Sequence, residues 1–238
     1  MDCSKDLKRG LRAGLPIGLG YFPVSLAFGF FAVSGGIPIW AAVLISLTNL
    51  TSAGQFAGTN LIIAGAGYIE VALTTFIINL RYMLMSLSLS QKVDEKITKF
   101  QRMLFSFGIT DETFVVASME SKKLTAGYMT GLIILPIAGW NLGTLVGAGV
   151  SNILPAALQN AMGIALYAMF IALIIPAARE NIKVLAVIWV AVVVMCLLKY
   201  ISMFSFISSG FRVIIATVAA AAAGAALFPA ASEVAEHE

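Results

Sequence analysis

The sequence predicts an all-α, polytopic membrane protein with roughly six to eight spanning or re-entrant helices, at least one of them broken. Hydrophobic residues make up 60% of the chain and charged residues 11%, and the mean hydropathy is +0.95. A soluble domain carries roughly 25% charged residues, so lipid must be the solvent for much of this chain. The apolar runs are long and continuous rather than alternating, which favours helices over a β-barrel.

The charged and reactive residues are too few and too scattered for an enzyme or a nucleic-acid-binding protein. The net charge is +3, and no stretch forms a basic stripe. Cys3 and Cys196 are far apart and His237 is the single histidine, so we expect no disulfide, metal cluster or catalytic triad. The sequence has no Walker motif, so we expect no ATP hydrolysis. We therefore predict no cofactor, no metal and no nucleic-acid partner.

The chain divides into apolar segments that we interpret as a single transmembrane domain covering residues 1–238. They are Leu15–Ser34, Ile37–Gly67, Tyr68–Leu89, Leu104–Met119, Leu124–Ala148, Ile153–Ile175, Ile182–Met203 and Phe211–Phe228. The first segment follows a basic arm and is long and rich in glycine and proline. We interpret it as a transmembrane helix rather than a cleaved signal peptide.

The second segment, Ile37–Gly67, is too long for one simple span. About 30 residues of helix extend roughly 45 Å, which exceeds the thickness of the hydrocarbon core. Its middle is polar and includes Ser52, Ala53, Gly54 and Gln55. A break at these residues would create two half-helices, whose unpaired N–H and C=O groups must line a cavity or contact protein. The alternative is a patch of interhelical hydrogen bonds within an unbroken helix.

Loop charge predicts that the N-terminus lies in the cytoplasm. Basic residues occur in the N-terminal arm and in later loops, at Lys92, Lys96, Lys99, Arg102, Lys122, Lys123, Arg179 and Lys183. A strict eight-span count places Lys92–Arg102 outside, against the positive-inside rule. Treating Ile37–Gly67 and the short segment Leu104–Met119 as re-entrant hairpins places every basic loop inside. Both counts are open at this point, and both put the two termini on the cytoplasmic side.

A weak internal repeat predicts two halves, residues 1–119 and 120–238. Its matches are Leu15-Pro16-Ile17 with Leu135-Pro136-Ile137, Ile37-Pro38 with Leu154-Pro155, and Arg81-Tyr82 with Lys199-Tyr200. Secondary transporters are commonly built from two such repeats, with the binding site between them. The alternative is a chance match in an apolar sequence of low diversity, and the sense of the repeat, parallel or inverted, is open.

Ionisable residues at membrane depth are costly and are functional by default. Arg81 lies near the middle of Tyr68–Leu89, close to Asn79, and Asp111 and Glu112 lie inside the short fourth segment. Arg81 either forms a structural ion pair with an acid such as Asp111 or has a direct functional role. Asp111 and Glu112 are either intramembrane charges or wet carboxylates on a re-entrant or interfacial helix, because their segment is shorter than a span.

These same residues carry a resemblance to the AzlC family, the azaleucine-resistance, branched-chain amino-acid permeases. The motifs are Ser52-Ala53-Gly54-Gln55-Phe56, Asn79-Leu80-Arg81-Tyr82, Thr110-Asp111-Glu112, and the opening Leu15-Pro16-Ile17-Gly18 with Tyr21-Phe22-Pro23-Val24. The resemblance covers essentially the whole chain and is strongest in its first half. It implies export of branched-chain or similar neutral amino acids, and a separately encoded small membrane subunit that resembles AzlD.

We therefore interpret the chain as a secondary exporter of the cytoplasmic (inner) membrane. The expected substrate-binding residues are Ser52, Ala53, Gly54, Gln55, Asn79 and Arg81, and the expected coupling or charge-pair residues are Asp111 and Glu112. The half-helix N-terminus near Gly54 would bind the substrate carboxylate, and free carbonyls or Asp111 would bind the ammonium. The rival interpretations are a channel or facilitator for small neutral solutes, an intramembrane enzyme, and a scaffold subunit whose partner carries the activity.

Overall fold

The computed structural model describes residues 3–151, 171, 174–176, 178–179 and 181–228. Their regular structure is helical, apart from an isolated bridge between Val93 and Leu124. Five helices in this part are long and apolar enough to cross a membrane: α1 (Cys3–Ser34), α4 (Tyr68–Ser90), α7 (Ala126–Val150), α9 (Ile182–Tyr200) and α10 (Ser209–Leu227). The polytopic all-α prediction is confirmed. The predicted segment Ile153–Ile175 lies almost entirely outside the described residues.

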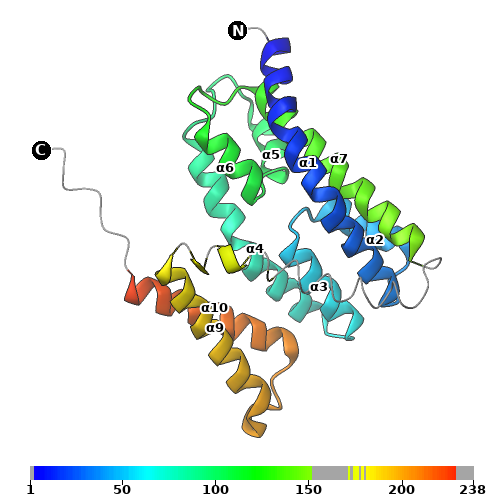
Figure 1. Ribbon diagram of the computed structural model, residues 1–238, viewed down its shortest axis with the longest axis vertical. Coiled ribbons are helices and arrows are strands. Elements are labelled where there is room, and N and C mark those ends of the chain that lie inside the picture. Colours follow the sequence, from blue (N-terminus) through cyan, green and yellow to red (C-terminus); the bar gives the residue numbers. More distant parts are fainter. Residues whose placement is uncertain (1–2, 152–170, 172–173, 177, 180, 229–238) are drawn as a thin grey trace, which may run out of the picture.

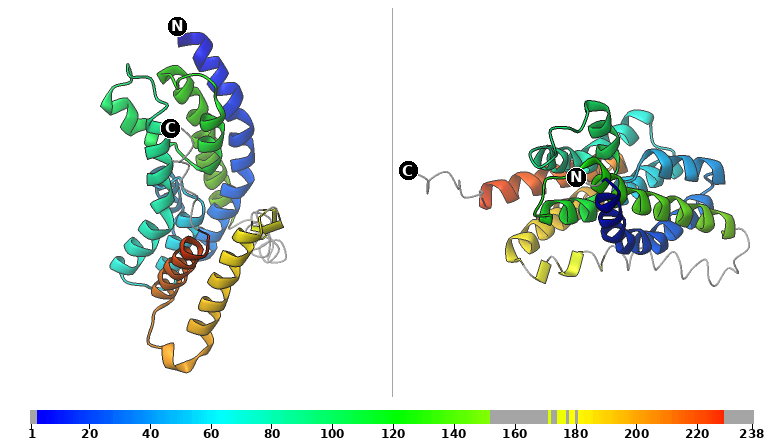
Figure 2. Two further views of the ribbon diagram at one scale, coloured as in Figure 1. Left: turned by 90° about the vertical axis from the view of Figure 1, so that its left-hand side faces the viewer. Right: turned by 90° about the horizontal axis from the view of Figure 1, so that it is seen from above.

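Helices α1 and α7 form the spine of the molecule and run side by side in the same direction (Figures 1 and 2). Glycines on α1 meet the backbone of α7, and glycines on α7 meet the backbone of α1, so a Cβ at Gly18 would lie 2.6 Å from the carbonyl oxygen of Leu135. Small residues spaced by four along a helix allow this close approach. The glycines Gly10, Gly14 and Gly18 of α1 and Gly139, Gly143 and Gly147 of α7 are therefore packing positions.

The second apolar segment forms two short helices, α2 (Ile39–Thr48) and α3 (Ala53–Ile63), that fold back on each other. Near the bend, Gln55 donates a hydrogen bond to Ser46 at 2.6 Å. At the open end, the side chain of Ile63 occupies the space beside Gly35, directly after α1. The segment is therefore a re-entrant hairpin that enters and leaves at the C-terminal end of α1. The helix is broken as predicted, but the break is at residues 49–52, so Ala53, Gly54 and Gln55 form the first turn of α3.

A second hairpin enters from the opposite end. It consists of α5 (Lys99–Phe107) and α6 (Asp111–Met119), and its tip is at residues 108–110. Its base is closed by backbone hydrogen bonds between Lys92 and Leu124 at 3.0 Å and between Asp94 and Leu124 at 3.0 Å. The predicted interruption of the fourth segment is confirmed, and α5 begins five residues before the predicted boundary at Leu104. The structure thus has the re-entrant arrangement rather than eight simple spans.

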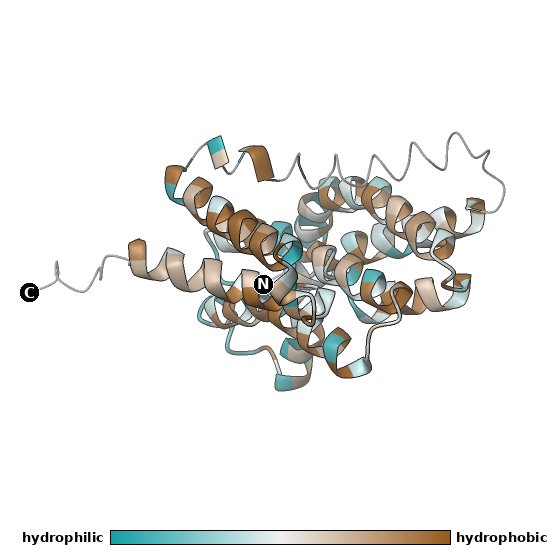
Figure 3. Cartoon of the chain, turned by 90° about the horizontal axis from the view of Figure 1, so that it is seen from below, coloured by the Kyte–Doolittle hydropathy of each residue, from teal (hydrophilic) through white to brown (hydrophobic). Residues whose placement is uncertain are grey.

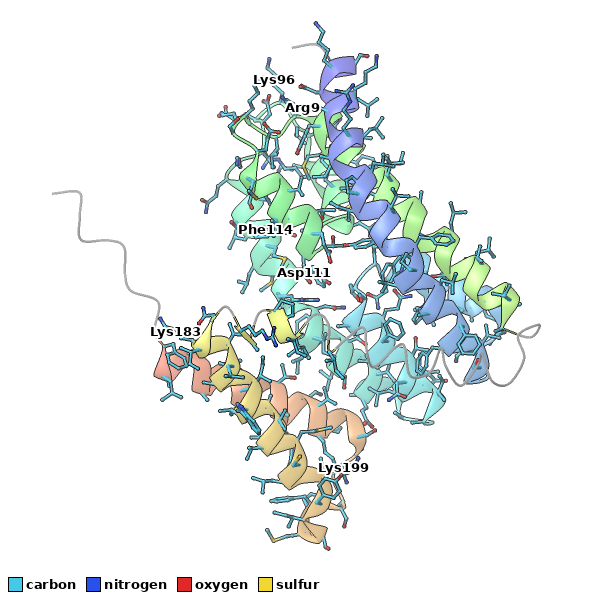
Figure 4. The ribbon with its side chains drawn as sticks, viewed as in Figure 1. Arg9, Lys96, Asp111, Phe114, Lys183 and Lys199 are labelled. Atoms are coloured by element: carbon cyan, nitrogen blue, oxygen red, sulfur yellow. The ribbon has the colours of Figure 1, made fainter. Side chains whose placement is uncertain are left out.

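The basic residues of the N-terminal arm and of the loops around the α5–α6 hairpin gather at the end where this second hairpin enters, which we call the basic end. Arg9 of α1 pairs with Glu120 at 3.7 Å, and Lys123 pairs with Glu95 at 3.3 Å. Figure 4 shows Arg9 and Lys96 together at this end, whereas Lys183, at the start of α9, lies apart from them. The loops that precede and follow the α5–α6 hairpin therefore share one side with the N-terminal arm, as the re-entrant count requires.

Helices α9 and α10 form an antiparallel pair, joined through the short 3-10 helix η1 (Ser202–Phe204), that contacts the rest of the described structure mainly at α4 (Figure 1). The carboxylate of Glu70 accepts a hydrogen bond from the amide of Gly210 at 2.6 Å, at the first turn of α10. Glu70 therefore anchors the start of α10 to the first turn of α4.

The outer surface is apolar, as lipid contact requires. Many large hydrophobic side chains are exposed, among them Leu84 and Leu87 at 63% and Trp189 at 62%, and Figure 3 shows hydrophobic residues along the lengths of the helices. Of the predicted repeat, Pro16 and Pro136 lie within α1 and α7, but Leu154 and Pro155 lie outside the described residues. The halves 1–119 and 120–238 therefore stay a prediction.

Candidate functional site

The tips of the two hairpins meet halfway along the spanning helices. Tyr82, in the middle of α4, donates a hydrogen bond to the carbonyl of Thr51 at the first tip, at 3.2 Å. Its neighbour Arg81 forms an ion pair with Asp111 at the second tip, with 2.7 Å between Nη1 and Oδ2. Tyr21, in the middle of α1, also contacts the second tip, at Thr110. Both α3 and α6 therefore begin at mid-depth, and Figure 4 shows Asp111 well away from the basic end.

Arg81 holds the two tips in one electrostatic network. Besides its pair with Asp111, Arg81 donates a hydrogen bond from Nη2 to the Tyr82 hydroxyl at 3.0 Å. That hydroxyl in turn donates to the carbonyl of Thr51. The third guanidinium nitrogen, Nε, is buried without a hydrogen-bond partner. The side chains of Arg81 and Asp111 each remain 41% exposed. The pair is therefore not sealed in the protein, and both side chains can also contact a bound molecule.

Glu112 has a different partner from its neighbour Asp111. The hydroxyl of Tyr21 donates a hydrogen bond to Glu112 Oε2 and lies 2.6 Å from Oγ1 of Thr110. The ring of Tyr21 packs edge-on against Trp140 of α7, with 5.3 Å between centroids and an interplanar angle of 78°. Tyr21 therefore links the first turn of α6 to the spine.

The side chain of Gln55 is fully engaged in a buried hydrogen-bond chain. Trp140 donates to Gln55 Oε1 at 3.1 Å, Gln55 Nε2 donates to Ser46 at 2.6 Å, and the hydroxyls of Ser46 and Thr144 lie 2.7 Å apart. Gln55 is 1% exposed and Trp140 2%. This chain fastens the α2–α3 hairpin to α7, because a buried amide or indole left without a partner is costly. The side chain of Gln55 is therefore not available to a ligand.

The N-terminus of α3 lacks the side-chain cap that α6 has, and in this sense we call it open. Helix geometry leaves the first amides, including those of Ala53 and Gly54, without an intrahelical partner, and the side chain of Ser52 makes no capping bond. Ser52 itself has φ 48° and ψ −93°, a conformation that side chains rarely adopt and that is often found at functional sites. At α6, Thr110 and Thr113 instead form a reciprocal capping box.

Asn79 of α4 lies against the open N-terminus of α3. A Cβ at Gly54 would collide with Oδ1 of Asn79, so the absence of a side chain at Gly54 permits this approach. Oδ1 of Asn79 is buried and has no hydrogen-bond partner. Unsatisfied buried polar atoms are rare in proteins. Asn79 and the α3 amides therefore place unused polar groups next to one another.

The structure brings together the predicted residues Ala53, Gly54, Asn79, Arg81 and Asp111. Glu112 lies beside Asp111 on the first turn of α6, and Ser52 lies in the strained linker before α3. Tyr21, Tyr82, Thr110, Trp140, Ser46 and Thr144 complete the network and were not predicted as site residues. Trp140, Ser46 and Thr144 could have been identified from the sequence, because each places a hydrogen-bonding group in a long apolar run, where that group needs a partner.

The described residues offer acidic and hydrogen-bonding groups rather than a metal site. No cluster of three or more histidine, cysteine, aspartate or glutamate side chains occurs in the part of the chain that the structure describes. One edge of the site carries free amides at a helix N-terminus and the other carries two carboxylates. The arrangement fits a molecule that has both an anionic and a cationic group.

An apolar cavity of about 200 Å³ lies on the basic side of the second hairpin tip. Its lining includes Ser86 and Leu89 of α4, Phe105 of α5, Met129 of α7, and Ile109, which directly precedes Thr110. Ser86 is one helical turn beyond Tyr82. The cavity thus extends from the neighbourhood of the site toward the basic end.

Comparison with known proteins assigns the chain to a family. The profile of the AzlC protein family matches residues 16–154. The inner membrane protein YgaZ of Escherichia coli is 29% identical over 186 residues, covering 75% of this chain and 76% of the relative. A membrane protein of Archaeoglobus fulgidus is 29% identical over 175 residues, covering 73% and 76%. A membrane protein of Helicobacter pylori is 26% identical over 200 residues, covering 82% and 86%.

No solved structure matches this chain. The family profile covers more than half of the chain, including both hairpin tips and the middle of α4, so the residues of the site lie within the matched region. The relatives are membrane proteins, in agreement with the five apolar helices. The chain is a multi-pass membrane protein and belongs to the AzlC family.

Proposed function

We propose that the chain is a secondary transporter that exports branched-chain or related neutral amino acids across the cytoplasmic membrane, together with a small AzlD-like membrane protein. The observation that carries the proposal is the meeting of two half-helix N-termini at mid-depth, one open and one lined by carboxylates. Membership of the AzlC family and the membrane-protein relatives support a role in transport rather than in catalysis.

The carboxylate of the substrate binds at the first turn of α3. The amides of Ala53 and Gly54 and the positive end of the helix dipole favour an anion there, and the amide nitrogen of Asn79 can donate to it, since Asn79 lies against Gly54. Broken helices of secondary transporters use half-helix N-termini in this way. Arg81, whose Nε is unpartnered, supplies a second contact.

The ammonium of the substrate binds at the first turn of α6. Asp111 is paired through one oxygen with Arg81 and is 41% exposed, so its other oxygen can accept from the ammonium. The side chain of the substrate then lies toward the apolar cavity that begins at Ile109 and Ser86. The apolar lining favours a neutral aliphatic side chain over a charged one.

The basic end faces the cytoplasm in this proposal, because lysine and arginine in short loops are retained on that side. The N-terminal arm and the loops that contain Lys92 and Lys123 share that end. Since α10 begins beside the start of α4, it returns toward the basic end, and both termini lie inside. A cytoplasm-active reporter fused after Glu238 should be active, and a periplasmic signal would contradict this topology.

Transport into and out of proteoliposomes tests the function. The chain is reconstituted with and without the small subunit, in vesicles that contain radiolabelled leucine, valine, lysine or aspartate. We expect efflux of leucine and valine against their own gradient when a pH gradient is imposed, and no efflux of lysine or aspartate above that of empty vesicles. Downhill movement alone would support a facilitator instead, and no movement of a neutral amino acid with either preparation would refute the proposal.

A matched pair of glycine variants ties the activity to the site. Gly54→Leu places a side chain where Asn79 Oδ1 and Thr51 Oγ1 already lie, whereas a Cβ at Gly67 meets nothing within 4 Å. We expect Gly54→Leu to lose export and Gly67→Leu to retain it, at equal amounts of protein in the membrane. Retained export by Gly54→Leu would show that the substrate does not bind at the N-terminus of α3.

A further inference from the structure

The first turn of α6 carries two adjacent carboxylates that the fold treats differently. Asp111 is ion-paired with Arg81 at 2.7 Å. Glu112 makes no ion pair with any basic residue in the described part of the chain, and its partner is the neutral hydroxyl of Tyr21. Successive residues of a helix point about 100° apart, so the two carboxylates face α4 and α1 respectively.

We propose that Glu112 binds and releases the proton that drives transport, while Asp111 remains the charge partner of Arg81 and serves substrate binding. The proposal rests on the proposed transport function. An unpaired carboxylate at membrane depth costs least when it can become neutral. Protonation of Asp111 would instead leave the guanidinium of Arg81 without its counter-charge, which is the more costly event.

Tyr21 gives the protonation of Glu112 a structural consequence. Its hydroxyl lies within reach of two acceptors, the carboxylate of Glu112 and Oγ1 of Thr110, the latter at 2.6 Å. When Glu112 is charged, the hydroxyl donates to the carboxylate, because hydrogen bonds to ionised acceptors are stronger. When Glu112 is neutral, the Thr110 hydroxyl competes for that donor. Thr110 caps α6 by accepting from the Thr113 amide at 3.4 Å, so the change reaches the hairpin tip.

The charged and titratable groups around Glu112 come from two spanning helices and from its own turn. Tyr21 faces it from α1, Arg81 and Tyr82 from α4, and Asp111 from α6. Arg81 is engaged by Asp111 and by Tyr82. Of these groups, Glu112 is the carboxylate whose charge the network does not balance.

The proton balance of one cycle follows from this arrangement. A proton from the outer solution binds Glu112 after the amino acid has left the site. The protonated carrier returns to the inward-facing state, and the proton leaves to the cytoplasm when the next zwitterion binds. One proton thus enters for each amino acid exported, and no bond other than the O–H bond of Glu112 is made or broken.

Two transport assays on the same proteoliposomes separate coupling from binding. Net efflux of leucine driven by a pH gradient needs proton transfer, whereas exchange of internal for external leucine at equal pH does not. We expect Glu112→Gln to abolish the stimulation of efflux by the pH gradient while it still exchanges leucine at a rate above that of empty vesicles. Asp111→Asn should lose both activities. Glu95→Gln, a change at an exposed carboxylate of the basic end, should leave both unchanged.

Tyr21→Phe provides an independent test, because this variant keeps the carboxylate of Glu112 itself. It removes the donor that favours the charged carboxylate, so the dependence of gradient-driven efflux on the outer pH should move toward higher pH without loss of the maximal rate. Gradient-driven efflux by Glu112→Gln, or an unchanged profile for Tyr21→Phe, would overturn the assignment of Glu112. A wild-type chain that exchanges no neutral amino acid would overturn the proposed function, and the assignment with it.

Discussion

The α1–α7 spine makes a prediction whose size can be worked from the structure. At Gly18 of α1, an added Cβ would lie 2.6 Å from the carbonyl oxygen of Leu135 and 2.8 Å from its carbon. Carbon–oxygen contacts between packed helices are normally about 3.3–3.6 Å, so Gly18→Ala must push the backbones apart by roughly 0.7 Å or more. At Gly20, two residues further along, a Cβ meets nothing within 4 Å.

The two substitutions should therefore change stability in opposite directions. Overpacking typically costs about 1–3 kcal/mol, and a radial gap of roughly 0.5–1 Å along a helix seam forfeits part of its dispersion energy as well. Alanine in a helix gains about 0.8–1.0 kcal/mol over glycine. We expect Gly18→Ala to be less stable than wild type by about 1–2 kcal/mol and Gly20→Ala to be at least as stable as wild type.

Unfolding of the purified chain in mixed micelles, with increasing SDS and detection by tryptophan fluorescence, measures the difference. Both variants carry the same added methyl group on the same helix, so helix propensity and hydrophobicity are matched. Gly149→Ala repeats the control on α7, where a Cβ again meets nothing within 4 Å. Equal stability of Gly18→Ala and Gly20→Ala would refute the close approach of α1 and α7.

Three further predictions concern the site. Arg81→Gln and Asp111→Asn should each impair export or insertion, and the double variant should be impaired less than additively, because an unpaired charge causes most of the damage; export rates and membrane levels measure this. Gln55→Leu should destabilise the chain by about 1–3 kcal/mol in the same micelle assay, since it leaves the buried indole N–H of Trp140 without an acceptor. Ala53→Cys, in a background without Cys3 and Cys196, should react with aqueous thiol reagents and be protected by leucine.

Each of these predictions has a control and a contrary outcome. Full additivity of the two charge variants would defeat the pairing of Arg81 with Asp111. Trp189→Phe, at a tryptophan that is 62% exposed, should not change stability, whereas Trp140→Phe should. Leu47→Cys, at a side chain that is 52% exposed on the outer face of α2, should stay unreactive if that face contacts lipid. Equal reactivity of Leu47→Cys and Ala53→Cys would show no selective access of water to the hairpin tip.

The sequence was most informative where one physical cost dominates. A 31-residue apolar stretch exceeds a bilayer span, so the break in Ile37–Gly67 was predictable from length and polarity alone. The cost of a lone charge at membrane depth likewise made Asp111 a candidate partner of Arg81 before any contact was known. The structure contains that contact at 2.7 Å. The functional role of the pair stays a prediction.

Side-chain direction was not predictable in the same way. Gln55 was expected to contact substrate, but its amide lies buried between Ser46 and Trp140. Which face of a short half-helix points to the site depends on the rotation of α3 against α7, and no local pattern determines this rotation in a helix that is apolar on most sides. The contact between Glu70 and the amide of Gly210 was not predictable from the sequence either, because the two residues lie far apart along the chain.

The two hairpins repeat one architectural unit in opposite orientations. In each, a spanning helix is followed by a re-entrant hairpin whose second arm begins at mid-depth, α3 after Ser52 and α6 after Thr110, with a phenylalanine four residues later at Phe56 and Phe114. The hairpins enter from opposite ends, so the positive ends of both arms converge. Two such ends would make two anion sites.

In the transport function proposed above, the asymmetry between the tips makes this pair of helix N-termini a site for a zwitterion. At α6, the helix dipole is neutralised from within, because Asp111 and Glu112 occupy its first turn and Thr110 caps it. At α3, no acidic residue lies in the first turn and no side chain caps it. We therefore propose that the open N-terminus binds the carboxylate and the acidic one binds the ammonium. Each tip belongs to a hairpin that enters from its own side of the membrane, so in the proposed transporter we expect one hairpin to move and open the site to its side while the other stays closed.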